Sequence, residues 1–403
     1  MTENITTRCC VVGGGPAGMM LGVLLARAGI DTVVLEKHAD FLRDFRGDTI
    51  HPSTLQVLTE LGWIEDFLRL PHQEISDIGI HVDGVPVPVA DFSHLPVQCR
   101  FVAMLPQWDF LDFLADRGGR LPGFHLHRRA EAMDLVIEDG RVAGVQVETP
   151  GGTRIVRADL VVAADGRHSR LRSAAGFQVR DLGAPMDVLW MKLPRLPSDP
   201  AAVLGNVKAG RLLVLINRGS YWQCAYVIPK GGYRAVRAEG LDVFRAALER
   251  TAPMLAGRTA ALESWDAVRV LTVSVDRLES WCRPGMLCIG DAAHAMSPIG
   301  GVGINLAIQD AVAAARILAP ALRRGIPDLD MLRRVERRRR WPTRATQRLQ
   351  ILAQDRIISP ILAGGGNGGG GLPLPLRLLR HIPFLRRIPA RLLGMGFRPE
   401  HIG

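Results

Sequence analysis

The sequence of 403 residues is poor in aromatic side chains and has no long uncharged apolar run. Aromatic residues make up 5% of the chain, and basic residues do not alternate with them as in a groove for single-stranded nucleic acid. No run of about eighteen uncharged apolar residues occurs, so we expect no membrane-spanning helix. A strand-like run begins almost at the first residue, so we expect no signal peptide.

Cysteine patterns and metal-ligand clusters are also missing. The six cysteines form no Cys-x-x-Cys pair, which predicts no disulfide framework and fits a reducing cytoplasm. Cys9, Cys10 and Cys288 lie in apolar runs, where cysteine usually acts as a small buried hydrophobe. His125 and His127 have no acidic or cysteine partners beside them, so we expect no metal site.

Basic residues outnumber acidic ones, 50 to 40, which gives a net charge of +10. Much of the excess lies in two late clusters, residues 333–340 and 377–391. We interpret these clusters as solvated helix faces. A contact between the leucine- and arginine-rich tail, residues 372–391, and an anionic membrane surface is the alternative. We therefore expect a cytoplasmic protein, with peripheral attachment to the inner membrane surface left open.

A glycine-rich motif near the N-terminus carries the strongest signal. Gly13, Gly15 and Gly18 follow a short apolar run, an amphipathic stretch comes next, and a second apolar run ends at Glu36. This strand–turn–helix–strand order is typical of a dinucleotide site, with phosphates at the helix N-terminus and the carboxylate on a ribose. The residues predicted to hold the dinucleotide here are Gly13, Gly15, Pro16, Ala17, Gly18, Glu36 and Lys37.

The remaining patterns predict an α/β fold with an inserted β-rich domain. Leucines recur at helical spacing in 54–70, and 107–117 also suits a helix. Strands are expected at 133–138, 141–149, 153–156, 159–164, 212–217, 221–229 and 286–289, and the alternating prolines at 85–88 suggest an edge strand. A long helix should begin near Ile304.

These elements suggest three regions. The first is a discontinuous nucleotide-binding domain, residues 1–74, 104–180 and 276–340. The second is a β-sheet domain for substrate, residues 75–103 and 181–275. The third is a helical tail, residues 341–403, with a glycine-rich linker at 364–371. Gly364, Gly366 and Gly369 repeat the glycine spacing, but prolines follow instead of a helix, so we interpret the tract as a linker.

Three segments together resemble the group A FAD-dependent monooxygenases, the p-hydroxybenzoate hydroxylase-like family. They are the glycine motif with Glu36, residues 159–172 (DLVVAADGRHSRLR) and residues 288–310 (CIGDAAHAMSPIGGVGINLAIQD). The last two are similar to the Asp-Gly and Gly-Asp motifs of that family, and all three occur in the expected order. The resemblance implies a Rossmann-like FAD domain of the GR2 type and an inserted substrate sheet.

The resemblance also assigns cofactor contacts. Asp291, after Gly290, would accept from the ribityl hydroxyls, with a turn cap as the alternative. The loop from Pro298 to Gly303 would lie against the flavin, and its backbone at Pro298 and Gly301 is the catalytic element we predict, with no side-chain base. The further predicted FAD contacts are Arg46, Gln107, Asp165, Gly166, Val302, Gly303, Ile304 and Asn305.

Several of these assignments have plainer alternatives. Asn305 could simply cap the helix that follows it. Asp165 and Arg172 could form an ordinary ion pair of a loop. His294 lies in the Gly-Asp motif, yet the family resemblance implies a structural role for it.

The chemistry implied by the resemblance is an NAD(P)H-consuming hydroxylation. NAD(P)H reduces FAD, dioxygen forms a flavin C4a-hydroperoxide, and one oxygen atom passes to an aromatic, phenolic or quinone-like substrate. An apolar pocket under the inserted sheet should exclude water. The residues considered for substrate contact are Trp190, Leu213, Tyr221, Trp222 and Tyr226, each of which also suits a sheet core.

Other functions are compatible with the same fold. A flavin-dependent reductase would not consume oxygen with its substrate. A halogenase is disfavoured by the missing Trp-x-Trp-x-Ile-Pro string. A membrane-surface flavoprotein acting on a lipidic quinone is the third alternative, and we expect no nucleic-acid partner.

Overall fold

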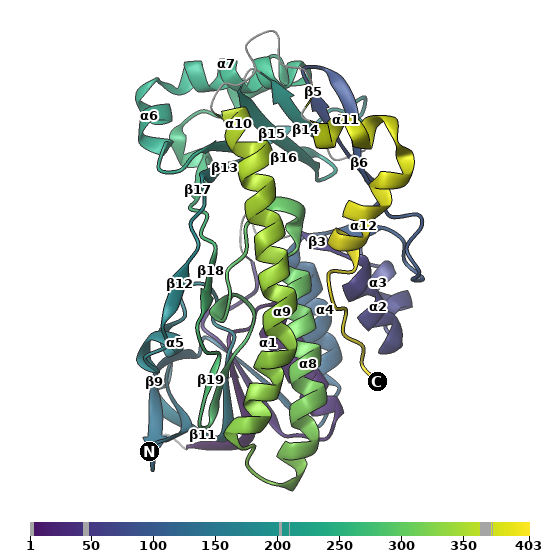
Figure 1. Cartoon of the computed structure of the whole chain (residues 1–403). Helices are drawn as coiled ribbons and strands as arrows, with labels where there is room; N and C mark the ends of the chain where they lie inside the picture. The colour runs from purple at the N-terminus through teal and green to yellow at the C-terminus, as the bar shows by residue number, and fades with distance from the viewer. Residues whose placement is uncertain (1–3, 43–47, 201–203, 209, 363–371, 373) are drawn as a thin grey trace.

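The computed structural model describes residues 4–42, 48–200, 204–208, 210–362, 372 and 374–403. They form an elongated molecule with one β-sheet near each end and two long helices along one side (Figure 1). These helices are α8, Gly303–Arg324, and α9, Leu329–Ala353. The mixed α/β class predicted from the sequence is confirmed.

The first sheet has eight strands around a parallel centre. Its strands are β1, Ile5–Val12; β2, Thr32–Glu36; β8, Phe124–Arg128; β9, Glu131–Glu138; β10, Arg141–Thr149; β11, Gly152–Ala163; β19, Cys282–Arg283; and β20, Met286–Cys288. The order is β19-β20-β11-β1-β2-β8, and β10 and β9 extend it antiparallel from β11. Helix α1, Pro16–Arg27, packs against α8 and against α4, Gln107–Gly119. Strands covered in this way are apolar along their length.

Parallel pairing brings the ends of four strands to one edge of this sheet. β20, β11, β1 and β2 are consecutive neighbours and run in the same direction. They end at Cys288, Ala163, Val12 and Glu36. Because ligands of open α/β sheets bind at the carboxyl ends of the strands, the three sequence motifs meet where a ligand is expected.

The second sheet has seven strands in the order β17-β13-β16-β15-β14-β5-β6. Their bounds are β5, Asp77–Val82; β6, Val85–Asp91; β13, Met186–Pro194; β14, Leu204–Lys208; β15, Arg211–Asn217; β16, Tyr221–Pro229; and β17, Arg269–Leu271. The prolines of β6 lie at the sheet edge, as predicted, because proline cannot donate to a neighbouring strand.

The two faces of the second sheet differ in what covers them. One face, which includes Leu213 and Tyr226, packs under α7, Leu241–Thr251, with Phe244 and Leu248. The opposite face packs against the rest of the molecule, and there Val227 clusters with Ile299 and Ile358. We call the second one the inner face. Successive residues of a strand alternate between the two faces.

Smaller elements connect the two ends. Two short sheets are β3-β7-β4 (Thr49–Ile50, Val102–Met104, Gln73–Ile75) and β12-β18 (Val179–Asp181, Asp276–Leu278). The other helices are α2, Pro52–Glu60; α3, Ile64–Leu68; α5, Arg170–Ala174; α6, Tyr233–Ala238; α10, Ser359–Leu362; α11, Leu374–His381; and α12, Arg387–Gly394. Short 3-10 turns include η4, Gly290–Ala292, and η5, Ile299–Gly301.

The structure corrects several expected elements. Residues 54–70 contain two helices instead of one, because the chain turns at Gly62, where φ is +75°. Residues 153–156 and 159–163 belong to the single long strand β11, which ends one residue before the predicted 164. Helices α6 and α7 interrupt the stretch 181–275 that we expected to be strands. Helix α9 also passes unbroken through residue 341, so no element boundary marks the predicted start of the tail, and the domain limits stay predictions.

The C-terminal end of the chain is held by buried charges. Glu400 is 1% exposed, and its carboxylate accepts hydrogen bonds from Arg338 Nε, at 2.8 Å to each oxygen, and from Arg339 Nη1 at 3.4 Å. Arg339 is itself buried and also donates to the backbone oxygen of Arg398 at 3.1 Å. Residues 398–400 are therefore an integral part of the nucleotide-binding end.

One described segment, Ile299–Arg324, is long and apolar enough to be considered as a membrane span. Within this segment, 83% of the most apolar stretch of 18 residues is buried inside the fold. That burial is what the core helix of a globular domain shows. All six cysteines are buried, as predicted for Cys9, Cys10 and Cys288 from their apolar surroundings.

Replacing Glu400 with Gln should lower the free energy of unfolding by about 3 kcal/mol, because two partly or fully buried arginines lose their counter-charge. Urea unfolding of the purified variant measures the change. Asp330→Asn is the matched control, since its pair with Arg333 is exposed and should contribute less than about 0.5 kcal/mol. Equal stability of the Glu400 variant and the parent would contradict this account of the tail.

Candidate active site

The glycine motif forms the turn between β1 and α1. Gly13 has φ +112°, and a side chain there would lie 2.3 Å from the backbone oxygen of Ala164. A Cβ at Gly18 would lie 1.9 Å from the oxygen of Gly13, so this helix residue must also be glycine. Gly15, in contrast, has open space where its Cβ would be. Two glycines thus serve the fold, and the third leaves room beside the positive end of α1.

Glu36 lies directly beside this turn. Its Oε2 accepts a hydrogen bond from the backbone N–H of Gly14 at 3.0 Å, and its Oε1 accepts from that of His38 at 2.9 Å. The side chain is 9% exposed. These bonds orient the carboxylate at the end of β2, where a ribose would be bound, while Lys37 next to it is exposed.

The Asp-Gly motif follows β11. Asp165 Oδ2 accepts from the backbone N–H groups of Arg170 and Leu171 at 3.0 and 3.4 Å. Its other oxygen is buried and has no hydrogen-bond partner among the described residues. Burial raises the pKa of this carboxyl, although hydrogen bonds from Ser169 and the backbone oppose the rise. Gly166 has φ +85° and open space at its Cβ position.

Arg172 does not pair with Asp165. Its guanidinium lies 3.6 Å from Asp276 Oδ1 and donates to the backbone oxygen of Ala292 at 3.3 Å. The alternative that Asp165 and Arg172 form an ion pair is therefore wrong. Arg172 instead connects α5 with β18 and with the Gly-Asp turn.

The Gly-Asp motif forms the turn after β20. Gly290 has φ +58°, and its N–H donates to Asp310 Oδ2 of α8 at 3.1 Å. The same oxygen lies 2.6 Å from His294 Nε2, and Asp310 Oδ1 accepts from Arg339 Nε at 2.9 Å. His294 thus has the structural role expected of it.

Burial alone would raise the pKa of Asp310. The charges of His294 and Arg339, and their hydrogen bonds, outweigh burial and hold the pKa below its usual value. This carboxylate stays ionised and fixes the turn that carries Asp291. The Asp291 side chain is 36% exposed, lies 3.8 Å from Arg167 Nη2 and does not cap the turn. It can therefore accept hydrogen bonds from a ligand.

The loop 298–302 leads into the N-terminus of α8. Gly300 and Gly301 have φ of +76° and +63°, and a Cβ at Gly301 would lie 2.4 Å from Thr49 Oγ1. The Thr49 hydroxyl donates to the Gly301 oxygen at 2.8 Å. Val302, the residue before α8, gives the helix no side-chain cap, so the first N–H groups of Gly303 and Ile304 face the loop. We call this loop, with its helix end, the flavin loop.

Asn305 is the third residue of α8, so the N-cap alternative is wrong. Its Oδ1 accepts from the His51 backbone N–H at 3.0 Å and from Thr54 Oγ1 at 2.7 Å, which joins α8 to the start of α2. Burial lowers the pKa of His51 to about 4 although a hydrogen bond to the Leu393 oxygen opposes the shift, so this ring is neutral at pH 7.

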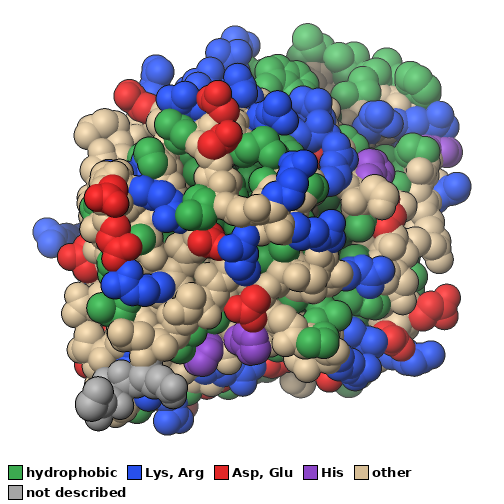
Figure 2. Space-filling view, turned by 90° about the horizontal axis from the view of Figure 1, so that it is seen from below, with side chains coloured by type: hydrophobic (Ala, Val, Ile, Leu, Met, Phe, Trp, Pro, Cys, Tyr) green, Lys and Arg blue, Asp and Glu red, His purple; other side chains and the backbone are tan. Residues whose placement is uncertain are grey.

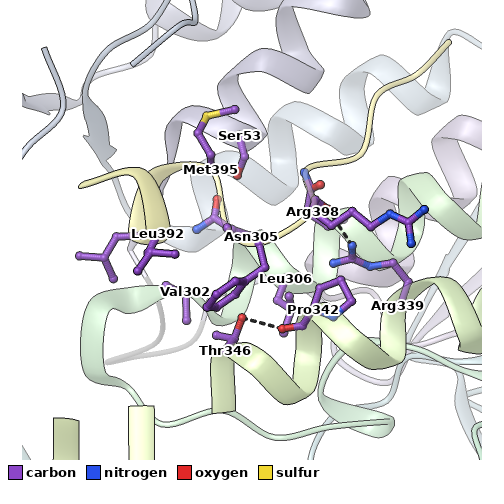
Figure 3. A pocket seen from close by; sticks show the side chains of 14 residues that line it. Ser53, Val302, Asn305, Leu306, Arg339, Pro342, Thr346, Leu392, Met395 and Arg398 are labelled. Atoms are coloured by element: carbon purple, nitrogen blue, oxygen red, sulfur yellow. Dashed lines mark hydrogen bonds between the residues drawn. The ribbon is translucent and has the colours of Figure 1, made fainter. Parts of the chain in front are cut away.

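Asn305 also lines a cavity of about 30 Å³ between α8, α9 and the segment 392–398 (Figure 3). The buried amide nitrogens of Asn305 and Gln309 border it and have no hydrogen-bond partner among the described residues. A space of this size holds a water molecule and is far smaller than a substrate pocket of roughly 300 Å³ or more. Contact of Asn305 with the flavin stays a prediction.

For two other predicted cofactor residues, contact with FAD stays a prediction. Arg46 lies outside the described residues, as does the glycine tract 364–371. Gln107 is the first residue of α4, and its backbone hydrogen-bonds the Asp48 carboxyl.

The substrate candidates separate by sheet face. Trp190 belongs to the inner-face cluster, and Tyr221 lies on the same face by alternation along β16. Leu213, Trp222 and Tyr226 belong to the core under α7, and Trp222 donates from its ring to Asp199 at 2.9 Å. The interpretation of these three as substrate contacts is corrected, because they lie on the opposite side of the sheet from the flavin loop.

Sequence reasoning missed a buried polar cluster beside the flavin loop. Asp48, next to Thr49, forms an ion pair with Arg218 and accepts from Gln223 Nε2 at 3.0 Å. Arg218 Nε donates to Gln223 Oε1 at 3.1 Å. Burial raises the pKa of Asp48 although Arg218 and Gln223 oppose it. No motif signals this cluster, because Asp48 is far in sequence from Arg218 and Gln223, which belong to the β15–β16 hairpin, and only the fold brings the two segments together.

The described residues fit an FAD molecule. Open space at Gly15 and the unpaired oxygen of Asp165 are the features that a bound dinucleotide would fill. Glu36 suits the adenosine ribose, the N-terminus of α1 the pyrophosphate, Asp291 the ribityl chain, and the N-terminus of α8 the flavin ring. A parallel nucleotide-binding sheet with these ends, joined to a second sheet over the flavin loop, defines a flavoprotein of the Rossmann-like class.

Comparison with known proteins identifies the family within this class to which the chain belongs. Residues 6–348 match a family described as "FAD binding domain". A 6-methylpretetramide 4-monooxygenase from Streptomyces rimosus is 33% identical over 359 residues, which cover 89% of this chain and 86% of that protein. The chain belongs to the FAD-dependent monooxygenases of group A, the aromatic hydroxylases, as the three motifs predicted.

Two further comparisons define the extent of the likeness. An uncharacterized aromatic compound monooxygenase, YhjG, from Bacillus subtilis is 25% identical over 79% of this chain, which spans only 62% of that longer protein. The crystal structure of OxyS anhydrotetracycline hydroxylase from Streptomyces rimosus has a TM-score of 0.76 and 23% identity, covering 99% of this chain and 78% of that one. The second comparison supports the fold alone.

Gly15→Ala should weaken FAD binding, whereas Gly18→Ala should lower the stability of the protein. The Gly15 variant should keep the stability of the FAD-free protein within about 1 kcal/mol, because nothing fills the space. Its FAD dissociation constant should rise about tenfold or more, since the methyl group meets the phosphates. The Gly18 variant should lose about 2 kcal/mol of stability or more from overpacking. Flavin titration and urea unfolding of both apoproteins test this contrast. A larger loss of stability for the Gly15 variant than for the Gly18 variant would refute it.

Asp291→Ala should weaken FAD retention and abolish activity, because the ribityl chain loses its acceptor. Flavin absorbance per protein after gel filtration measures retention. Glu263→Ala, an exposed acid beyond α7, is the control and should retain FAD fully. A fully flavinated and active Asp291 variant would show that the Gly-Asp turn has another role.

Proposed function

We propose that the protein hydroxylates an aromatic, phenolic or quinone-like compound with NAD(P)H and dioxygen. The balanced reaction converts substrate, NAD(P)H, O₂ and a proton into hydroxylated substrate, NAD(P)⁺ and water. The similarity to a 6-methylpretetramide 4-monooxygenase and to a para-nitrophenol 4-monooxygenase supports the substrate class. Both names describe a 4-monooxygenase.

The observation that carries this proposal is the apolar inner face next to the flavin loop. Ile299 of the loop packs with Val188 and Val227 of the sheet and with Ile358 after α9. When bound, FAD would accept a hydride from NAD(P)H and activate dioxygen at its C4a atom. The apolar side chains at the flavin loop would keep water out, which favours transfer of the oxygen atom to the substrate over loss of hydrogen peroxide.

The chain's own residues supply position and charge. The uncapped N-terminus of α8 places partial positive charge at the loop, where it would stabilise negative charge on a reduced ring. The Asp310 carboxylate holds the turn that carries Asp291. Asp165 provides a free buried acceptor beside the glycine turn.

The Asp48 cluster gives the inner face a polar group. Arg218 and Gln223 hold the Asp48 carboxyl one residue from the contact between Thr49 and the flavin loop. Perturbed carboxyl groups next to a cofactor are typical of functional sites. We propose that this cluster orients a hydroxyl or carbonyl group of the substrate toward the loop.

Oxidation of NADPH and NADH by the FAD-loaded protein, with oxygen and peroxide followed together, tests the proposal over a panel of phenols and quinones. A hydroxylase should show substrate-stimulated oxidation, little peroxide and a product heavier by one oxygen atom. Reduction of a substrate double bond without oxygen uptake would establish a reductase. A product that contains halide instead of oxygen would establish a halogenase, and either result would overturn the proposal.

Two adjacent leucines of β15 provide a matched pair of variants. Leu212→Ala removes a half-buried inner-face side chain and should raise the KM for the aromatic substrate and the share of peroxide. Leu213→Ala removes a fully buried side chain under α7 and should cost about 2–5 kcal/mol of stability while leaving the KM unchanged. If the second variant changes the KM and the first does not, the substrate lies on the other face.

A further inference from the structure

The tail presents an exposed apolar and basic surface on the outer flank of the molecule (Figure 1). Five large apolar side chains there are strongly exposed: Leu374, Leu378, Ile382, Phe384 and Ile388, at 64, 41, 43, 65 and 54%. Residues 374–391 also carry five arginines and no acidic residue. We call the exposed side of this segment the tail face. Exposed apolar side chains gathered in this way mark a binding surface more often than a solvated one.

The tail face has a fixed position on the protein because the opposite side of the segment is buried. Leu376 and Ala390 are 3% and 0% exposed, and α11 and α12 both pack on the edge strand β6. Arg386 donates to the backbone oxygens of Leu379 and Arg380 at 2.8 and 2.9 Å, which closes the turn between the helices. The apolar side chains therefore point outward from a folded support.

The arginines of the tail face are available for an anionic partner. Arg377, Arg380 and Arg391 are exposed, and none of them forms an ion pair with a carboxylate in the described part of the chain. Arg387 lies over the Phe384 ring at 5.1 Å and contacts His94. Apolar and cationic groups thus alternate over the same short segment.

We propose that the tail face binds the surface of an anionic lipid bilayer. Leucine, isoleucine and phenylalanine side chains would enter the boundary between headgroups and acyl chains, and the arginines would contact lipid phosphates. No residue of the tail face is among the flavin contacts described above, so the proposal does not depend on the proposed reaction.

Other partners fit the tail face less well. A symmetric contact with a second copy would bring two basic, acid-free surfaces together, which repels. A nucleic acid would favour flat aromatic rings for stacking, whereas four of the five exposed apolar side chains are aliphatic. A lipid surface uses both the aliphatic side chains and the charges.

Vesicle flotation of the full-length, FAD-loaded protein tests the proposal. The protein should float with vesicles of phosphatidylcholine and phosphatidylglycerol, and far less with phosphatidylcholine alone. Binding should weaken as salt is raised. The triple variant Arg377→Gln, Arg380→Gln, Arg391→Gln should lower the partition coefficient on the order of 100-fold. The triple variant Leu378→Gln, Phe384→Gln, Ile388→Gln should lower it on the order of 10-fold or more.

Control variants distinguish binding by the tail face from a general effect of net charge or of exposed apolar side chains. Basic side chains also gather over α8 and α9, on the upper side of the view in Figure 2. Arg337→Gln, Arg344→Gln, Arg348→Gln removes three exposed arginines of α9 and should leave binding within about twofold. Ile137→Gln, Ile326→Gln, Leu352→Gln removes scattered side chains of similar exposure and should do the same.

FAD content and urea unfolding of each variant confirm that it is folded. Absence of flotation with anionic vesicles would overturn the proposal. Equal losses in the α9 and tail variants would also overturn it, because binding would then follow net charge. If the tail variants change only the oligomeric state in light scattering, the partner is a second copy and not a membrane.

Discussion

The carboxylate of Asp310 is the group on which the two ends of the nucleotide site depend. It is 0% exposed, and its three partners come from the Gly-Asp turn, from the histidine three residues beyond that turn's aspartate and from α9. A buried charge without partners costs several kcal/mol, so these segments must assemble around it together. Arg339 also donates a hydrogen bond to Glu400, so the position of residues 398–400 depends on the same buried group. A single ionised group thereby aligns the turn that bears Asp291 with α8, whose N-terminus follows the flavin loop.

The second sheet depends on a different constraint, the alternation of its side chains. Leu212 and Leu213 are neighbours in sequence, yet one packs toward the flavin loop and the other under α7. Since the two faces have different partners, a shift by one residue would exchange the side chains that pack toward the flavin loop with those that form the core under α7. The same alternation places Gln223 of β16 next to Asp48, at the junction of both parts of the molecule.

The sequence alone predicted the local features of the site well. The turns at Gly13 and Gly290 and the start of α8 follow from short motifs, because neighbouring residues and one strand end determine them. The face on which Trp222 and Tyr226 lie could not be predicted, since both faces of this sheet are apolar. The pair of Asp48 with Arg218, and that of Arg339 with Glu400, join residues far apart in the chain and carry no motif. Such contacts are set by how the two sheets and the tail pack.

The position of Glu400 in the chain also has a consequence for synthesis. On a ribosome, Gly290, Asp310 and Arg339 emerge well before Glu400, and translation proceeds at about 5–20 residues per second. For several seconds Arg339 is present without one of its two carboxylate partners. The Gly-Asp turn is therefore expected to stay loosely packed until residues 398–400 reach it. Flavin incorporation would then follow the emergence of residues 398–400, even though every residue assigned to the cofactor has been made long before.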